Sequence, residues 1–125
     1  MIVQTLTKKV LIADDHELTR CTLKLLLKRQ PFVATVLEAK DGHQAIEQVH
    51  KHQPDVVLMD LQMPVMDGWT ASHRIRQNFP QIKIIAYSAV ENDQVVHLLQ
   101  SGVIDAFCDK ETCSHHLIET IRSLI

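Results

Sequence analysis

Short apolar runs alternate with segments of helical periodicity along the whole chain. Apolar or β-branched runs bounded by acids, Gly or Pro are typical of strands that are buried on both faces. Apolar side chains spaced three and four residues apart are typical of helices. The pattern predicts five strands, at residues 10–13, 32–39, 55–60, 82–87 and 104–108. Each is followed by a predicted helix, around residues 18–26, 45–49, 69–77, 95–99 and 117–124.

The spacing of residues inside two of these segments shows why they are predicted to be helices. In the first helix, the i, i+3, i+4 positions are held by Leu18, Cys21, Thr22, Leu25 and Leu26. In the last helix, the apolar stripe consists of Leu117, Ile118, Ile121 and Leu124.

The strict alternation of strands and helices predicts an α/β fold with a five-stranded parallel sheet, doubly wound by five helices. Nearly continuous apolar strands agree with this, because helices cover both faces of such a sheet. In open sheets of this kind, ligands bind beyond the carboxyl ends of the strands. That edge is therefore the place to look for chemistry.

Polar side chains that can do chemistry follow the predicted strands at this edge. Asp14 and Asp15 follow the first strand, and Asp60 ends the third. Ser88 follows the fourth strand, and Lys110 follows the fifth. We expect all five side chains to lie close together.

Three carboxylates that converge on one edge repel each other unless one is protonated or a cation neutralises them. Mg²⁺ suits such a site because it takes oxygen ligands, keeps several waters and leaves room for a phosphate. A Lys ammonium and a Ser hydroxyl can bind phosphoryl oxygens, and a carboxylate can act as the nucleophile. The residues thus favour phosphoryl transfer to an aspartate, which needs mainly in-line positioning and charge neutralisation.

With these residues in place, the sequence strongly resembles the receiver domain of two-component response regulators over nearly its whole length. The matching features are the acidic pair Asp14-Asp15, Asp60 within MDLQMPVMDG, Ser88 within YSA, and Lys110. The resemblance implies a flavodoxin-like fold with strand order 2-1-3-4-5. It also implies a signalling domain rather than an enzyme, although such domains promote their own phosphorylation and dephosphorylation.

Residue by residue, the resemblance implies that Asp60 accepts a phosphoryl group from a histidine kinase or a phosphotransfer protein. Asp15 and Asp60 would hold Mg²⁺ directly, Asp14 directly or through water, and the backbone carbonyl of Gln62 would complete the protein ligands. Ser88 and Lys110 would bind the phosphoryl oxygens.

Phe107, three residues before Lys110, matches the aromatic switch position of the family. Phosphorylation would draw the Ser88 hydroxyl inward, and the Phe107 ring would fill the space beside the fourth strand. The surface expected to change comprises the fourth helix, the fifth strand and the last helix, around His97, Gln100, Asp105 and His116. A homodimer partner or an output domain would bind there.

Residues 1–125 are expected to form one receiver domain with no output domain in the chain. DDH at the first strand end, MDGWTASHRIR and DKETCSHHLIETI look more like receivers joined to helix-turn-helix DNA-binding outputs. We therefore expect a fragment of such a regulator, with a stand-alone receiver as the alternative. Many receivers carry Pro after the conserved Lys, but Glu111 stands there, so no cis peptide is expected.

Composition and net charge exclude several classes of protein. The net charge of −2 lacks the basic field of a nucleic-acid binder, so the chain alone should bind no DNA. No apolar run approaches the roughly 18 residues of a membrane span, and the start lacks the order of a signal peptide. Three widely spaced cysteines favour a reducing cytoplasm over a disulfide framework.

Two other functions remain open at this point. A Mg²⁺-dependent phosphohydrolase could also form an aspartyl-phosphate, but it usually has a second acid two residues after the nucleophile, where Gln62 stands. A pseudo-receiver would act only by binding partners, against which the complete set of acids, Ser88 and Lys110 argues. Near the end of the chain, Cys108, Cys113, His115 and His116 fit no standard zinc spacing.

Overall fold

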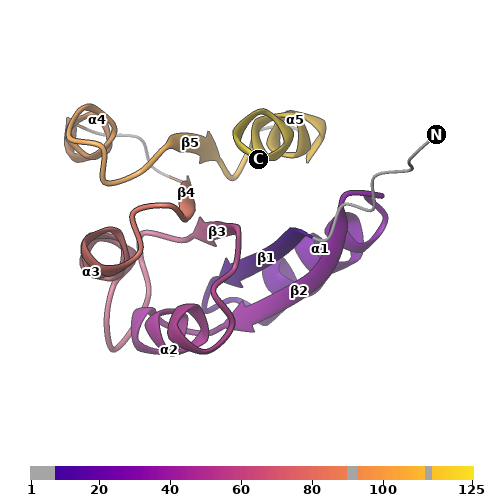
Figure 1. Ribbon diagram of the computed structural model, residues 1–125, viewed down its shortest axis with the longest axis horizontal. Coiled ribbons are helices and arrows are strands. Elements are labelled where there is room, and N and C mark those ends of the chain that lie inside the picture. Colours follow the sequence, from indigo (N-terminus) through magenta and orange to yellow (C-terminus); the bar gives the residue numbers. More distant parts are fainter. Residues whose placement is uncertain (1–7, 90–92, 112–113) are drawn as a thin grey trace.

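In the computed structural model, which describes residues 8–89, 93–111 and 114–125, strands and helices alternate as predicted (Figure 1). The strands are β1 (Lys8–Ala13), β2 (Val33–Ala39), β3 (Val56–Met59), β4 (Lys83–Ser88) and β5 (Ala106–Asp109). The helices are α1 (Glu17–Lys28), α2 (Gly42–His52), α3 (Gly68–Asn78), α4 (Asp93–Gln100) and α5 (Ser114–Leu124). Observed and predicted ends agree within one or two residues for the strands.

The five strands form one parallel sheet in the order β2-β1-β3-β4-β5. This confirms the predicted fold class and strand order. The order reverses direction at β1, because β2 lies on one side of it and β3 on the other. The carboxyl ends of β1 and β3 therefore flank the point where a doubly wound sheet leaves room for a ligand.

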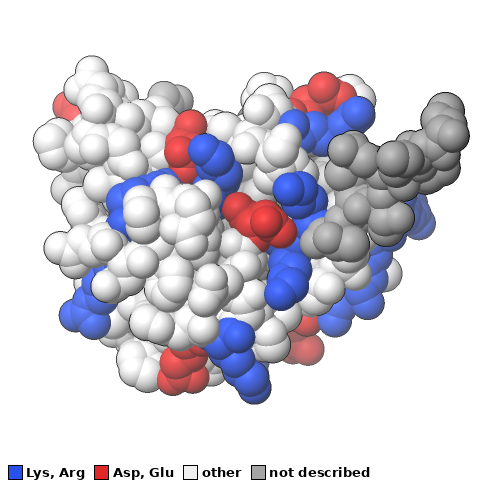
Figure 2. All heavy atoms as spheres, viewed as in Figure 1, with Lys and Arg blue, Asp and Glu red and all other residues white. Residues whose placement is uncertain are grey.

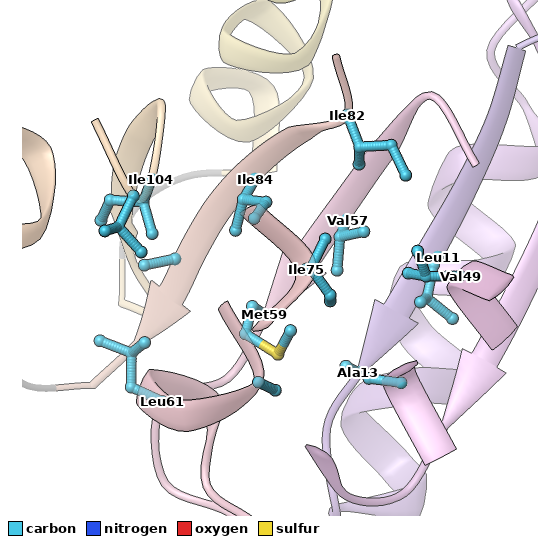
Figure 3. Packing of buried hydrophobic residues seen from close by; sticks show 14 of the residues in the cluster. Leu11, Ala13, Val49, Val57, Met59, Leu61, Ile75, Ile82, Ile84 and Ile104 are labelled. Atoms are coloured by element: carbon cyan, nitrogen blue, oxygen red, sulfur yellow. The ribbon is translucent and has the colours of Figure 1, made fainter. Parts of the chain in front are cut away.

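Alternate residues of the strands pack into two separate apolar clusters, one on each face of the sheet. On one face, Leu11, Val57 and Ile84 pack with side chains of α2, α3 and α4, as Figure 3 shows for most of this cluster. On the other face, Ile12 and Leu58 pack with α1 and α5. In Figure 1 the two groups of helices accordingly lie on opposite sides of the sheet. The central strands are buried on both faces, which explains their unbroken apolar sequence.

The first helix forms where the helical spacing predicted it, as α1. It buries Arg20, Leu23 and Leu27, while Leu18 is 79% and Leu25 is 61% exposed. The leucine-rich run satisfies helical spacing on two faces, so periodicity alone could not choose between them. The predicted stripe of α5 is confirmed, with Leu117, Ile118 and Ile121 buried and Leu124 packed against the same cluster.

The turn after β3 is held by close backbone packing. The amide of Gly68 donates to the carbonyl of Leu61 at 3.1 Å, and Asp67 caps α3 by accepting from the amide of Thr70 at 2.8 Å. A Cβ atom at Gly68 would collide with the backbone carbonyl of Asp60. The Asp-Gly pair therefore lets α3 start directly against the strand end that carries Asp60.

Candidate functional site

Parallel pairing of β1 with β3 brings two carboxylates together at the sheet edge. Ala13 pairs with Met59, and the amide of Asp60 donates to the carbonyl of Ala13 at 2.9 Å. Asp14 and Asp60 are the residues that follow this pair, and they are only 1% and 4% exposed. The sequence prediction that these acids converge is confirmed.

Lys110 lies between the two buried carboxylates. Its Nζ is 2.7 Å from Asp14 Oδ2 and 3.1 Å from Asp60 Oδ2. The amide of Lys110 donates to the carbonyl of Ser88 at 2.9 Å, which fixes the start of the side chain beside β4. Burial lowers the pKa of Lys110, but hydrogen bonds and attraction from Asp14 and Asp60 outweigh it and raise the pKa above its ordinary value. The ammonium therefore stays charged.

The surroundings of Asp60 disfavour the ionised form of its carboxylate. Burial raises its pKa above the ordinary value, and the negative charge of Asp14 raises it further. Hydrogen bonds from the Gln62 amide (3.1 Å) and from Lys110 act in the opposite direction without cancelling the effect of burial. A cation or a covalent change that neutralises Asp60 would thus stabilise the fold.

Asp15 and His16 form the outer part of the site. The Asp15 side chain is 32% exposed, and the Nδ1 atom of His16 is 3.3 Å from its Oδ1 and 3.0 Å from Oδ1 of Asp14. Ligand atoms of Asp14, Asp15, His16 and Asp60 all lie within 4.8 Å of one another. Sequence reasoning missed His16 as part of this group, although its position directly after the two acids could have indicated it.

The other predicted site residues lie on the neighbouring strands. Ser88 is the last residue of β4 and is 2% exposed, and Phe107 pairs with Ala86 in the register of β4 and β5. The Phe107 ring is partly buried and packs against the larger apolar cluster. Gln62 follows Asp60 by two residues and is exposed, with its amide bonded to Asp60. The expected roles of Ser88, Phe107 and the Gln62 carbonyl remain predictions.

The structure also describes the peptide bond after Lys110, the Cys108 side chain and the Asp105 carboxylate. The described residues contain no cis peptide bond, as expected from Glu111. Cys108 is buried, whereas Cys113 lies outside the described residues, so the structure does not test the Cys/His cluster as a whole. Asp105 was expected on a switching surface, but its carboxylate is bound by Arg76 at 2.6 Å and by the amide of Ile84 at 2.8 Å.

The acidic group fits a divalent cation. Its three carboxylates supply oxygen ligands of the kind that Mg²⁺ prefers, and two of them are buried where their repulsion is poorly screened. Lys110 supplies one positive charge between Asp14 and Asp60 but does not reach the outer Asp15–His16 side as an ion-pair partner. The residues of this group therefore fit a divalent cation beside the ammonium.

A match to a known protein family identifies the kind of domain that carries this site. Residues 10–122 match the family model described as the response regulator receiver domain. The chain belongs to the response regulator receiver family. As a receiver domain it is a signalling domain of two-component systems.

Relatives and solved structures agree with this assignment. The chain is 38% identical over 115 residues to the response regulator protein VraR of Staphylococcus saprophyticus, covering 91% of this chain and 54% of that protein. A receiver protein, TrrA of Thermotoga maritima, solved with Mg²⁺ and BeF, has a TM-score of 0.83 and 25% identity; the match covers 95% of this chain and 100% of TrrA. A DNA-binding response regulator of the LuxR family from Staphylococcus aureus gives a TM-score of 0.85 and 25% identity, with coverage of 94% and 98%.

The expected resemblance to receivers of DNA-binding regulators is therefore confirmed by the relatives. The chain spans about half the length of the curated relatives that it matches.

None of the described helices is long and apolar enough to cross a membrane. Figure 2 shows acidic and basic side chains interspersed over one face of the molecule, without a large basic field.

The raised pKa of Asp60 predicts a stability change on neutralisation. A carboxyl whose pKa is higher in the folded than in the unfolded chain favours folding below the unfolded pKa, and this contribution is lost as the pH rises through the folded pKa. Asp60→Asn should therefore melt at a higher temperature than the wild type in EDTA at pH 7, and the difference should narrow as the pH falls toward 4. Thermal unfolding by circular dichroism checks this; a variant that melts lower at pH 7 would contradict the electrostatic interpretation.

Proposed function

We propose that this receiver accepts a phosphoryl group on Asp60 from a phosphohistidine of a histidine kinase or phosphotransfer protein, with Mg²⁺ as cofactor. The observation that carries the proposal is the buried Asp60 carboxylate with Lys110 at 3.1 Å and Asp14 beside the same ammonium. Solved relatives support it, since TrrA is described in complex with Mg²⁺ and BeF, and RcsB of Salmonella enterica with phosphomimetic BeF₃⁻.

The residues divide the chemistry among them. An oxygen of Asp60 attacks phosphorus, the bond from phosphorus to the donor imidazole breaks, and its electron pair returns to the ring nitrogen. Lys110 passes from the Asp60 carboxylate to a phosphoryl oxygen, and Ser88 donates to another. Bound Mg²⁺, held by Asp14, Asp15, Asp60 and the carbonyl of Gln62, would neutralise phosphoryl charge.

Neither alternative function gains support. A phosphohydrolase of this type needs a second acid two residues after the nucleophile, but Gln62 is there. Its backbone N–H donates a hydrogen bond to Asp60. A pure interaction module has no need for three acids and a lysine in contact at one edge. We place the chain's activity in the cytoplasm, in keeping with phosphotransfer from a kinase, and propose no nucleic-acid binding by these residues alone.

The exposed face of α1 is a suitable docking surface for the phosphoryl donor. Leu18 and Leu25 lie on it, and they line a groove of about 550 Å³ together with Tyr87 and Lys110. The two leucines expose apolar area in the same groove as Lys110, and a partner that covers the groove would remove this area from water. A donor protein that covers this groove would place its phosphohistidine next to Asp60.

Phosphorylation would be transmitted through Ser88 and Phe107 to the surface formed by α4, β5 and α5. The strand register places the two residues on neighbouring strands near the same edge. Val96 (41% exposed) and Leu99 (38% exposed) give the α4 part of this surface an apolar character, suited to a second receiver or an output domain. Asp105 would contribute only if its ion pair with Arg76 opened.

The phosphoacceptor assignment predicts a single modification that depends on Mg²⁺. Incubation with acetyl phosphate should add one phosphoryl mass to the wild type with Mg²⁺ and far less in EDTA, while Asp60→Asn should gain none. Asp67→Asn is the matched control, because the residue lies in the following turn and Asn also caps helices well. Modification of Asp60→Asn at the wild-type rate, measured by intact mass, would refute the assignment.

The docking surface predicts that donor protein and small donor respond differently to substitutions on α1. Leu18→Lys and Leu25→Lys should slow transfer from phosphorylated kinase domains by roughly tenfold or more, because loss of a central interface anchor costs about 2 kcal/mol or more. Both should accept phosphoryl groups from acetyl phosphate at the wild-type rate. Val96→Lys on α4 is the control, and equal slowing by all three variants would argue against α1.

The switch predicts that Ser88→Ala separates phosphorylation from the conformational change. The variant should still be modified on Asp60, because Lys110 and the acids are intact. Amide chemical shifts of residues 93–107 should change much less with beryllofluoride than in the wild type, since Ser88 can no longer be drawn inward. A full wild-type shift pattern in Ser88→Ala would show that the coupling runs by another route.

A further inference from the structure

His16 differs from the other paired histidines of the described chain. His43 and His115 each face a single carboxylate one helical turn away, Glu47 at 3.0 Å and Glu119 at 3.7 Å, on exposed helices. The ring of His16 instead faces two carboxylates, Asp14 and Asp15, at the end of β1. It is also the histidine that lies with three acids in one compact group.

The backbone holds the His16 ring in this place. The His16 amide donates to Asp14 Oδ1 at 2.8 Å, and the His16 carbonyl accepts the hydrogen bond of the Arg20 amide in the first turn of α1. Arg20 is 6% exposed, and its guanidinium donates to the backbone carbonyl of Asp14 at 2.7 Å. The segment between β1 and α1 is therefore anchored at both ends, and the His16 side chain, which is 65% exposed, contacts Asp14 and Asp15 from this anchored backbone.

The group offers three carboxylate oxygens and one imidazole nitrogen within 4.8 Å of one another. Mg²⁺ prefers oxygen ligands and gains little from an imidazole, whereas Zn²⁺ accepts carboxylate oxygen and histidine nitrogen in four-coordinate sites. Among the divalent ions of the first transition row, affinity for nitrogen-containing sites generally rises toward the end of the row. An oxygen-only site and this mixed site should thus differ in their response to Zn²⁺ more than to Mg²⁺.

We infer that Asp14, Asp15, His16 and Asp60 form a mixed oxygen and nitrogen site that binds Zn²⁺ more tightly than Mg²⁺, with His16 Nδ1 as the fourth ligand. The carboxylates are those that the proposed function assigns to Mg²⁺, so Zn²⁺ competes with Mg²⁺ for them. Only this competition rests on the proposed function. The binding of Zn²⁺ itself rests on the four side chains.

The hydrogen-bonding role of His16 has to be separated from ligation. An imidazole that only donated to Asp14 and Asp15 would orient the carboxylates and affect every metal alike. Glutamine at this position keeps an N–H donor for the carboxylates but has no nitrogen lone pair for a metal. His16→Gln is therefore the informative variant, and His43→Gln, which removes a histidine paired with one acid, is its matched control.

Titration calorimetry with ZnCl₂ and with MgCl₂ on the full chain tests the inference. Loss of the nitrogen ligand in His16→Gln should weaken Zn²⁺ binding by roughly tenfold or more, with the Mg²⁺ affinity changed by less than about twofold. His43→Gln should bind both ions as the wild type does. Imidazole resonances in the wild type should show that the His16 ring shifts first as Zn²⁺ is added, which locates the ion.

Three results would overturn the inference. These are wild-type Zn²⁺ affinity in His16→Gln, equal losses for Zn²⁺ and Mg²⁺, and a Zn²⁺ titration that shifts other histidines and leaves His16 unchanged. Failure of Mg²⁺ to bind the wild type, with Zn²⁺ still bound through His16, would count against the proposed function and not against this site. Normal Mg²⁺-dependent phosphorylation without His16-dependent Zn²⁺ binding would have the opposite meaning.

Discussion

Repulsion between Asp14 and Asp60 is the constraint on which the site depends. Parallel pairing of β1 with β3 leaves these carboxylates side by side and almost fully buried, where water screens their charges poorly. Lys110 compensates part of this repulsion from the end of β5, yet the pKa of Asp60 remains above its ordinary value, mainly because of burial. The folded chain thus holds a carboxylate that is stabilised by any added positive charge.

The rest of the edge keeps that arrangement rigid. Gly68 allows α3 to approach the backbone of Asp60, and Asp67 caps the helix that begins there. On the other side, the buried guanidinium of Arg20 links α1 to the carbonyl of Asp14 and to Glu38 of β2. Because the backbone of each acid is held by its neighbouring helix, a bound cation is a direct way to relieve the repulsion that Lys110 leaves uncompensated.

The sequence predicted what depends on the order of residues along the strands. Apolar runs that end in an acid, a serine or a lysine place those side chains at one edge of any parallel sheet, so the convergence of Asp14, Asp60 and Lys110 needed no knowledge of side-chain packing. The buried face of α1 depends on packing, and helical spacing alone did not indicate it. A run with leucines at 18, 23, 25, 26 and 27 has two apolar faces, and only the sheet decides which one is covered.

His16 and Asp105 show the same limit for polar residues. Nothing in their spacing says that one ring nitrogen contacts two carboxylates or that one carboxylate is already bound by Arg76. The exposure of Leu18 and Leu25 on α1 has a cause in the packing of the same helix. Arg20 has to face inward to hold the carbonyl of Asp14, and in a helix this turns Leu18 and Leu25 outward, beside the open site. The contact that stiffens the acidic edge therefore also exposes the apolar surface that we propose as the docking site of the phosphoryl donor.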